Sequence, residues 1–431
     1  MLVDLGELKE LVEWEAVERF EEGYNVDVEE VRRRAKKAKS ASELMAIYRA
    51  LGEAEPRRGY PFREPTDLKA IVTERPAPPT RVHVDLSAEE LAGRLLGAWL
   101  GRCAGCILGK PVEGWSRERI VKALKAAGEY PLKGPYFPAA AFPELERERL
   151  LPLTREGLRR AERDDDLDYT LLNLMVYEAQ GSQFHTEDVA EAWLSLLPYR
   201  LTYTAERAAY RNLVLGFKPP ETATYLNPYR EWIGAQIRAD LWGYISPGDP
   251  GRAAELAYRD ARLSHTKNGV YGEMFAAAML ALAYAVDSPR KLVEEALKVI
   301  PERSRLAEAV RYVLTLHAKG LEWEEAVGDI LSRYGSYHPV HTINNAAIVV
   351  AALLWGEGDF ARAVTYAVAA GLDTDCNGAT AGSVIGLMLG AKNLPREWVE
   401  PLNDRLATAL SGVGEVRISE LARRTAKCVY L

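Results

Sequence analysis

Apolar residues recur at three- and four-residue intervals along most of this chain, and the strict alternation of a half-buried strand is scarce. Such a pattern predicts helices packed on helices, because each apolar stripe needs a partner to leave water. Helices are expected at 169–180, 187–197, 252–263, 272–286, 289–300, 303–317, 323–333, 342–354, 360–369, 377–389 and 418–427. The sequence therefore predicts an all-α, multi-helix globule and not a βαβ fold.

A further helix is expected after residue 87, where Ser87-Ala88-Glu89-Glu90 has the form of a capping box. Small residues recur through this helix at three- or four-residue intervals, at Gly93, Gly97, Gly101 and Gly105. With so little side chain on one stripe, another backbone is expected to pack very close to it. The stripe is interpreted as structural.

The first 82 residues differ in composition from the rest of the chain. Residues 1–53 are rich in Glu, Lys and Arg and carry apolar positions at helical spacing, so they predict charged helices. A Pro-rich stretch with Pro56, Pro61, Pro65, Pro76, Pro78 and Pro79 follows and predicts an irregular connector. We expect an N-terminal helical extension over 1–82 and a main domain over 83–431.

Composition excludes several classes of protein. Hydrophobic residues make up 48% of the sequence. The net charge is −7, and the sequence has no basic stripe between aromatic residues, which argues against long nucleic acid as a partner. Four cysteines are too few for a disulfide framework in 431 residues, which favours a reducing compartment. The N-terminus does not resemble a signal peptide, and the longest apolar stretches, 275–286 and 346–355, are shorter than the ~20 residues of a membrane span. We expect a cytoplasmic protein without a membrane partner, and the oligomeric state stays open.

Two short motifs were tested and rejected as functional sites. Residues 104–111 resemble a phosphate-binding P-loop that ends in Lys110, but Ala104 replaces its first glycine and Pro111 its Ser or Thr. Cys103 and Cys106 form a CxxC pair without a second pair at zinc-site spacing, so a buried pair on a helix is the simpler interpretation.

Four aspartates in five residues, at 164, 165, 166 and 168, directly precede an apolar run. One or two would suit the positive end of a helix dipole. Four exceed what a helix start needs, because like charges so close repel one another unless a cation neutralises them. The run is therefore either a solvated helix start or part of a metal site.

A second acidic segment, Asp373-Thr374-Asp375, lies between two Ala-rich apolar stretches that suggest burial. An unpaired buried carboxylate is costly, and carboxylate oxygens are the ligands that Mg²⁺, Mn²⁺ or Ca²⁺ prefer. Five acids in the two segments suggest two ions, which suits a hydrolase that polarises a substrate oxygen and a water together.

These motifs resemble, in order, those of the ADP-ribosylglycohydrolase family, and the resemblance covers about residues 88–431. Residues 105–113 are similar to the family's G-D-A-L-G-x-P-x-E loop, Asp164-Asp165-Asp166 to its T-D-D, Ser264-His265 to its S/T-H segment, and 371–382 to its G-G-D-T-D-T-N-x-A-x-A-G signature. The resemblance implies an all-α fold with two Mg²⁺ ions, with Mn²⁺ as the alternative. Residues 1–82 have no counterpart in it.

Carried over position by position, the resemblance implies metal ligands, catalytic carboxylates and substrate contacts. The implied metal ligands are Asp164, Asp165, Asp166, Asp373, Asp375 and Cys376, and the implied catalytic carboxylates are Glu113, Asp165 and Asp166. His265 is implied as a ribose contact, and Asn227, Gln236 and Arg238 as pocket residues.

Three positions depart from the family pattern. Asp164 replaces a threonine, Cys376 replaces another threonine, and Cys106 replaces an aspartate, and a thiol is a poor ligand for Mg²⁺. The expected function is metal-dependent hydrolysis of the glycosidic bond of an ADP-ribosyl or related ribosyl group, carried by a small molecule or a protein. The alternatives are a catalytically silent homologue that binds nucleotide or ADP-ribose, and a metal hydrolase of another bond such as a phosphoester.

Overall fold

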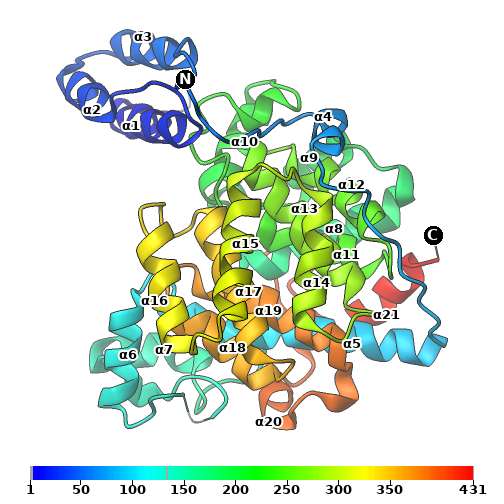
Figure 1. The fold of residues 1–431 in the computed structure, drawn as a ribbon. Coiled ribbons are helices and arrows are strands. Elements are labelled where there is room, and N and C mark those ends of the chain that lie inside the picture. Colours follow the sequence, from blue (N-terminus) through cyan, green and yellow to red (C-terminus); the bar gives the residue numbers. More distant parts are fainter. Residues whose placement is uncertain (1–2, 133, 431) are drawn as a thin grey trace.

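Helices dominate the structure, a computed structural model that describes residues 3–132 and 134–430 (Figure 1). Within these residues the helices are α1 (Leu5–Glu21), α2 (Val28–Lys37), α3 (Ala41–Gly52), α4 (Leu68–Thr73), α5 (Ala88–Gly109), α6 (Arg117–Ala126), α7 (Glu144–Leu150), α8 (Asp165–Gln180), α9 (Thr186–Leu196), α10 (Thr204–Val214), α11 (Asp240–Tyr244), α12 (Pro250–Ala261), α13 (Lys267–Leu282), α14 (Pro289–Ala296), α15 (Arg305–Ala318), α16 (Trp323–Tyr334), α17 (Thr342–Gly356), α18 (Phe360–Ala369), α19 (Thr374–Leu389), α20 (Arg396–Val399) and α21 (Ile418–Cys428). Strands β1 (Arg405–Ala407) and β2 (Glu415–Arg417) form one antiparallel pair, with Leu406 opposite Val416. The all-α prediction is confirmed.

Helices α5, α13, α17 and α19 form the centre of the main body. In α13, every residue from Asn268 to Leu282 is buried, and α17 and α19 are buried over nearly their whole lengths. A helix buried on all sides needs no polar face, which explains why these segments read as apolar in every direction. Amphipathic helices such as α12, α14 and α21 surround them with a polar face outward.

The glycine stripe on α5 lies directly against α19, which is the close approach of another backbone that the sequence predicts. A Cβ added at Gly97 would lie 2.3 Å from the carbonyl oxygen of Gly386, and one at Gly101 would lie 2.1 Å from that of Gly382. One added at Gly105 would lie 1.9 Å from the carbonyl oxygen of Gly378. The helices therefore run antiparallel in backbone contact. This register places the end of α5 beside the start of α19.

The capping box predicted at the start of α5 is confirmed. Ser87 Oγ accepts from Glu90 N at 3.2 Å, and Glu90 Oε2 accepts from Ser87 N at 2.8 Å. The segment Ala88–Val112 is long and apolar enough to cross a membrane by length and composition, but 72% of that window is buried inside the structure. Its apolar character is accounted for by the contacts of α5 with its neighbours in the core.

Helices α1, α2 and α3 form a separate small lobe that projects from the body (blue in Figure 1). Their apolar side chains form a cluster of their own. Leu226 of the body is a buried member of this cluster, and Tyr225 and Tyr229 of the body pack against it. The boundary near residue 82 stays a prediction, and residues 1, 2, 133 and 431 of the two expected parts lie outside the described residues.

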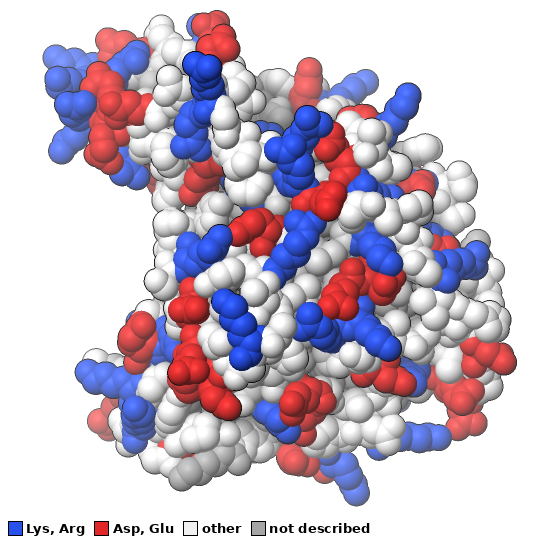
Figure 2. All heavy atoms as spheres, viewed as in Figure 1, with Lys and Arg blue, Asp and Glu red and all other residues white. Residues whose placement is uncertain are grey.

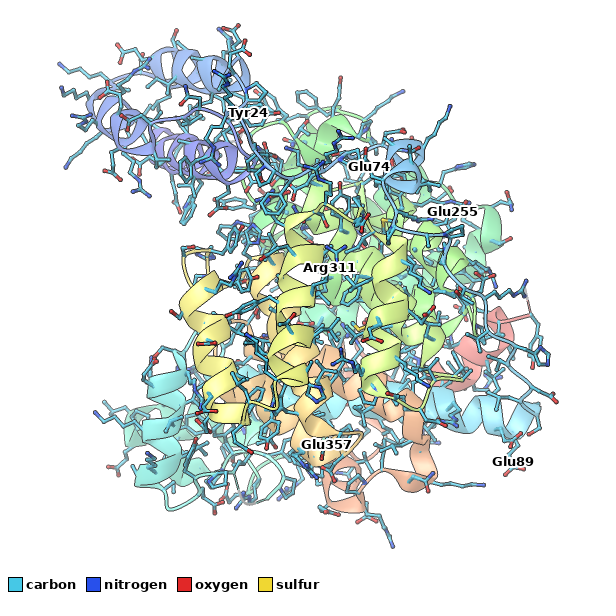
Figure 3. All side chains as sticks on the ribbon, viewed as in Figure 1. Tyr24, Glu74, Glu89, Glu255, Arg311 and Glu357 are labelled. Carbon is cyan, nitrogen blue, oxygen red and sulfur yellow. The ribbon has the colours of Figure 1, made fainter. Side chains whose placement is uncertain are left out.

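The Pro-rich connector runs over the body and is held there by backbone hydrogen bonds. Arg63 N donates to the Arg303 carbonyl and Val82 N to that of Gly248, both at 2.8 Å. Glu302 N donates to the Glu74 carbonyl at 2.8 Å, and the side chain of Arg311 donates to the Glu302 carbonyl at 2.8 Å. Glu74 and Arg311 are labelled in Figure 3. Irregular backbone of this kind is ordered because its polar groups find partners on the body.

Lys and Arg side chains alternate with Asp and Glu side chains over the face of the molecule drawn in Figure 2. Ion pairs join many acidic and basic side chains of the described residues, such as Arg424 with Glu178 at 2.6 Å. This face has no extended basic patch of the kind that attracts long nucleic acid.

Candidate functional site

The two acidic segments lie at the N-terminal ends of two different helices, α8 and α19, and line one cavity of about 340 Å³. Glu113, just after the C-terminal end of α5, lines the same cavity. The positive ends of both helix dipoles therefore face a cluster of carboxylates, which lowers the cost of keeping negative charge there. Folding brings together residues about 200 positions apart.

On the α8 side, Asp164 is the N-cap of the helix, and its Oδ1 accepts from Asp166 N at 3.0 Å. Asp168 points away from the cavity, since its Oδ1 accepts from Thr408 Oγ1 at 2.5 Å and its Oδ2 accepts from Arg163 Nε at 2.7 Å. Of the four aspartates in this run, Asp164, Asp165 and Asp166 line the cavity. Asp168 instead accepts hydrogen bonds from Arg163 and Thr408, which stabilise the fold.

On the α19 side, the chain is held at both ends of the Asp-Thr-Asp segment. Asn345 on α17 accepts from Asp373 N at 3.1 Å and from Asn377 Nδ2 at 2.8 Å. Thr374 Oγ1 donates to the Gly109 carbonyl at 2.9 Å, which ties this segment to the end of α5. Asp373 and Asp375 are thereby fixed beside Glu113.

Glu113, Asp373 and Asp375 form a triad whose carboxylate oxygens lie within 4.8 Å of one another. Asp375 is buried, and its Oδ1 has no hydrogen-bond partner among the described residues. Burial, followed by the charge of Glu113, raises the pKa of Asp375 well above its usual range. Glu113 as a whole is accessible, but its carboxylate lies against the cavity wall. Burial there, followed by the charges of Asp373 and Asp164, raises the pKa of Glu113 to about 7.

The acids on the α8 side, in contrast, have cations of their own. Lys110 forms an ion pair with Asp164 Oδ2, and Arg102 lies 3.5 Å from Asp166 Oδ1. Burial alone would raise the pKa of Asp164, but the Lys110 ammonium outweighs it and holds this pKa below its usual value. Burial and the charge of Asp164 raise the pKa of Asp166 well above its usual range.

Cys376 contributes a thiol to this side of the cavity. Its Sγ donates to Asp166 Oδ2 at 3.2 Å, and burial raises its pKa well above the usual value. A protonated thiol is a weak donor and a poor ligand for a hard cation. Its predicted role as a metal ligand stays a prediction, and the structure places it here as a hydrogen-bond donor to Asp166.

The donor set of the triad fits a divalent cation. Three carboxylates that line the cavity offer hard oxygen atoms, and the buried Asp375 Oδ1 has no hydrogen-bond partner among the described residues. Such an oxygen carries a large desolvation cost that a bound cation would offset. An all-oxygen set of this kind matches the ligand preference of hard divalent cations such as Mg²⁺, Mn²⁺ and Ca²⁺.

The predicted substrate contacts lie near the cavity but inside buried hydrogen-bond networks. Arg238 donates to Glu206 at 2.7 Å and to Asp260 at 3.0 Å, and Asn227 donates to the carbonyls of Ala223 and Ser264 at 2.9 and 2.8 Å. Among the described residues that line the cavity, neither of the two appears. Their substrate roles stay predictions.

His265 and Gln236 are likewise buried. His265 Nδ1 lies 2.8 Å from Ser264 Oγ, and burial lowers its pKa well below the usual value, so the ring is neutral. The side-chain oxygen of Gln236 has no hydrogen-bond partner among the described residues, although Gln236 does not line the cavity. These two predicted contacts are neither confirmed nor contradicted by their positions.

Three residues of the site lay outside the sequence prediction. Lys110 falls in the rejected P-loop and in residues 105–113, which resemble the family loop, but neither pattern assigns it a role. Glu206 lines the cavity, and burial raises its pKa to about 7 in spite of the Arg238 guanidinium. Asn345 lies in an apolar helix pattern, and its sequence context gives no indication that it holds Asp373.

A second cleft of about 470 Å³ adjoins the acidic cavity and shares Tyr203 and Thr204 with it. Aromatic rings dominate its lining, from Trp14, Tyr199, Tyr203, Tyr229, Trp232 and His338. Trp232 and His338 stack at 3.9 Å, and Trp14 of the extension meets Trp232 edge-on at 5.4 Å. Arg207 and Arg211 add positive charge to this aromatic cleft, and Glu7 and Glu10 lie at its edge as exposed acids.

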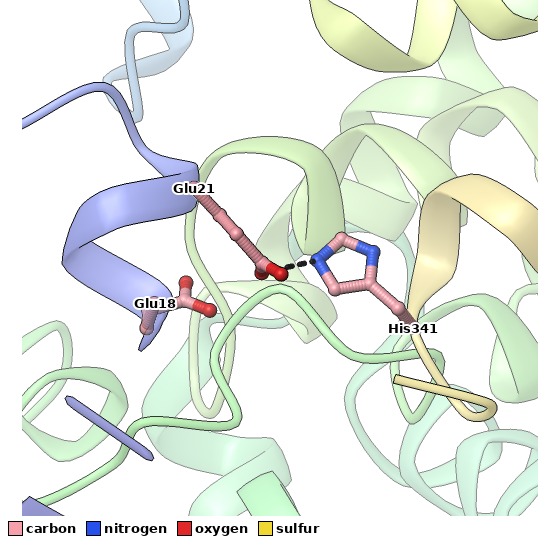
Figure 4. A group of neighbouring side chains, drawn as sticks. All are labelled: Glu18, Glu21 and His341. Carbon is pink, nitrogen blue, oxygen red and sulfur yellow. Dashed lines mark ion pairs between the residues drawn. The ribbon is translucent and has the colours of Figure 1, made fainter. Parts of the chain in front are cut away.

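A second group of candidate ligands, Glu18, Glu21 and His341, lies where α1 meets the start of α17 (Figure 4). His341 Nδ1 accepts from Ile343 N at 3.1 Å, so the proton of the neutral ring is on Nε2. Nε2 lies 3.8 Å from Glu21 Oε2, and a nitrogen that carries a proton cannot bind a metal. This group therefore joins the extension to the body through polar contacts and is not interpreted as a metal site.

Comparison with known proteins bears on the main body of the chain. A family model described as ADP-ribosylglycohydrolase matches residues 87–428, which include both aspartate segments and Glu113. Among solved structures, one described as "ADP-ribosylglycohydrolase-related protein complex" aligns with a TM-score of 0.46 at 20% identity, over 79% of this chain and 98% of that chain. No protein with a curated description matches the sequence.

Proposed function

The chain belongs to the ADP-ribosylglycohydrolase family, which supports a glycohydrolase-type function, and we propose that it hydrolyses the glycosidic bond of an ADP-ribosyl or related ribosyl group with the help of Mg²⁺ or Mn²⁺. The observation that carries the proposal is the convergence of Glu113, Asp373 and Asp375 in one cavity, with a buried carboxylate oxygen that lacks a partner. Asp165 and Asp166 line the opposite side.

The proposed reaction needs a water activated beside an anomeric carbon that becomes positively charged. When bound by the triad, a divalent cation would polarise substrate oxygens and a water molecule. Glu113 is the accessible carboxylate of the triad, so it is the group placed to accept a proton from the attacking water. The carboxylates of Asp165 and Asp166 stabilise positive charge on the anomeric carbon, and the cavity walls exclude bulk water.

The aromatic cleft supports a substrate that carries a base and phosphates. Its rings offer flat faces for stacking on a purine, and the guanidinium of Arg207 lies over the Tyr203 ring at 5.4 Å, at the junction with the acidic cavity. A ribosyl group in the acidic cavity and a base in the cleft would be joined across Tyr203 and Thr204. The combined space suits a nucleotide-sized ligand.

Hydrolysis of ADP-ribosyl-arginine, ADP-ribosyl-serine and simple nucleosides, each with Mg²⁺, Mn²⁺ or EDTA, tests the proposal. We expect metal-dependent release of ADP-ribose or ribose from at least one substrate. Glu113→Gln is expected to lower kcat by about 10²–10⁴-fold, the usual contribution of a general base. The matched control is Glu118→Gln, at an exposed position on α6, and it is expected to leave kcat unchanged.

Absence of cleavage of every substrate under every metal would contradict the proposal. Product analysis also separates glycosidic cleavage from phosphoester cleavage, since the latter would release phosphate or a nucleoside monophosphate.

A specific observation favours a catalytically silent homologue as the second candidate, because Lys110 and the Cys376 thiol already partner two of the acids. Tight binding of ADP-ribose with no product after long incubation would support that candidate.

A further inference from the structure

The two sides of the acidic cavity differ in how their negative charge is compensated. On the α8 side, Lys110 is ion-paired with Asp164, and Arg102 lies 3.5 Å from Asp166 Oδ1. On the other side, no Lys, Arg or His among the described residues forms an ion pair with the triad of Glu113, Asp373 and Asp375. One half of the site thus carries its own cations, and the other half carries none.

We propose that the Lys110 ammonium takes the place of one divalent cation in this cavity, so that the chain binds a single ion, at Glu113, Asp373 and Asp375. The proposal rests on the proposed function and specifies the metal content of its site. The sequence leads to the expectation of two ions, and the charges in the structure point to one.

Asp164 is fully engaged without a metal. Its Oδ1 accepts the backbone N–H of Asp166 at 3.0 Å, and its Oδ2 is held by Lys110. A divalent ion at Asp164 would have to lie next to a fixed ammonium in a buried cavity, where the repulsion of like charges is strong. Lys110 follows directly after α5, whose contact with α19 fixes its position. The backbone of Lys110 is therefore held within reach of Asp164, and its ammonium forms the ion pair.

Asp375 differs from Asp164 in that no cation among the described residues forms an ion pair with it. Asp375 lines the cavity and is 4% exposed, and its Oδ1 is buried without a hydrogen-bond partner among the described residues. With Glu113 and Asp373 it offers three hard oxygen donors within 4.8 Å of one another. An uncompensated buried charge is retained where a ligand neutralises it. The triad is thus the half of the cavity that requires an external cation.

The test is the number of Mn²⁺ ions bound by the full-length chain, measured by isothermal titration calorimetry and by metal analysis after dialysis. We expect one ion per wild-type chain and an EPR spectrum of isolated Mn²⁺. Lys110→Met is expected to bind a second ion at Asp164 and Asp166, with the EPR signature of a spin-coupled pair. Because Lys110→Met leaves the buried Asp164 without its cation, Lys110→Gln, which keeps an N–H donor, is the second variant. Lys122→Met, at an exposed position on α6, is the matched control and should keep one ion.

Two ions in the wild-type chain would overturn the inference and leave the proposed hydrolase intact. A single ion in both folded Lys110 variants would also overturn it. One ion in the wild type and two in the variants, without hydrolysis of any ADP-ribosyl substrate, would support the inference while contradicting the proposed activity. No bound ion in the wild type would contradict both.

Discussion

At the level of single residues, burial governs the charge of Glu21, which faces His341 at the junction of α1 and α17 (Figure 4). Burial, followed by the charges of Glu231 and Glu22 against the opposing effect of Arg305, raises the pKa of Glu21 from 4.5 to about 8. The folded chain therefore holds this proton more tightly than the unfolded chain. Its contribution to stability is complete below pH 4.5 and is lost as the pH rises through about 8.

Glu21→Gln is expected to remove most of this pH dependence, because the amide stays neutral at every pH. The wild-type free energy of unfolding should fall between pH 5 and pH 8 by at most about 1.4 kcal/mol per pH unit from this group. Glu18 also has a raised pKa and should leave a residual slope. Thermal unfolding at several pH values measures the effect, with Glu10→Gln, at an exposed position on the same helix, as the control. Equal slopes in wild type and Glu21→Gln would contradict the assignment.

Single residues also show which parts of the site the sequence could predict. Asp164, Asp373 and Asp375 stand out because clustered acids next to apolar runs are costly without a reason. Lys110 and Asn345 do not stand out, since their roles depend on contacts with residues 54 and 28 positions away. A lysine after a helix and an asparagine inside one are ordinary locally. Only the packing of α5, α17 and α19 gives them their partners.

At the level of elements, the contact of α5 with α19 sets the geometry of the cavity. The glycine stripe was visible in the sequence and the helices themselves were predicted, but the partner helix was not identified. Small residues at 378, 382 and 386 have the same spacing as those on α5. A spacing alone does not say which of many helices will meet it, because close backbone approach depends on the arrangement of the whole core.

Gly101→Ala is expected to destabilise the chain by about 3 kcal/mol, since its Cβ would lie 2.1 Å from the Gly382 carbonyl oxygen. The shift of α19 should also weaken Mn²⁺ binding, because α19 carries Asp375. Urea unfolding and metal titration measure the two effects.

The matched control for this substitution is Gly93→Ala on the same helix, where an added Cβ meets nothing within 4 Å. It should stabilise the chain by about 0.5–1 kcal/mol, the gain from replacing a helical glycine. Similar stability changes in the two variants would show that backbone contact does not determine the register.

At the level of the whole molecule, the extension docks on the body through buried charge. Arg230 is 4% exposed, and its guanidinium lies 2.7 Å from Glu15 and 3.7 Å from Glu18 on α1, and 3.0 Å from Glu22 at the C-cap of α1. The charged composition of residues 1–53 predicts charged helices but does not say which charges are buried. Three of those charges are buried against the body, which a single helix pattern does not reveal.

Arg230→Met is expected to release the extension, because it leaves three buried carboxylates without their main cation, a loss of about 3–5 kcal/mol. Amide hydrogen exchange should accelerate in α1 while the amides of α17 and α19 stay protected, since the core of the body does not depend on this contact. Arg32→Met is the control, because Arg32 pairs with Glu29 on the surface of α2, where such pairs contribute little.

Release of the extension has a consequence for the site itself. Trp14 lies in the aromatic cleft with Trp232, and Trp232 directly precedes Ile233 and Gly234 in the wall of the acidic cavity. Arg230→Met should therefore weaken the binding of ADP-ribose while the number of bound metal ions stays the same. If amide exchange in α1 accelerates in this variant but its affinity for ADP-ribose does not change, the extension does not contribute to substrate binding. A parallel loss of metal would show instead that the body had been disturbed.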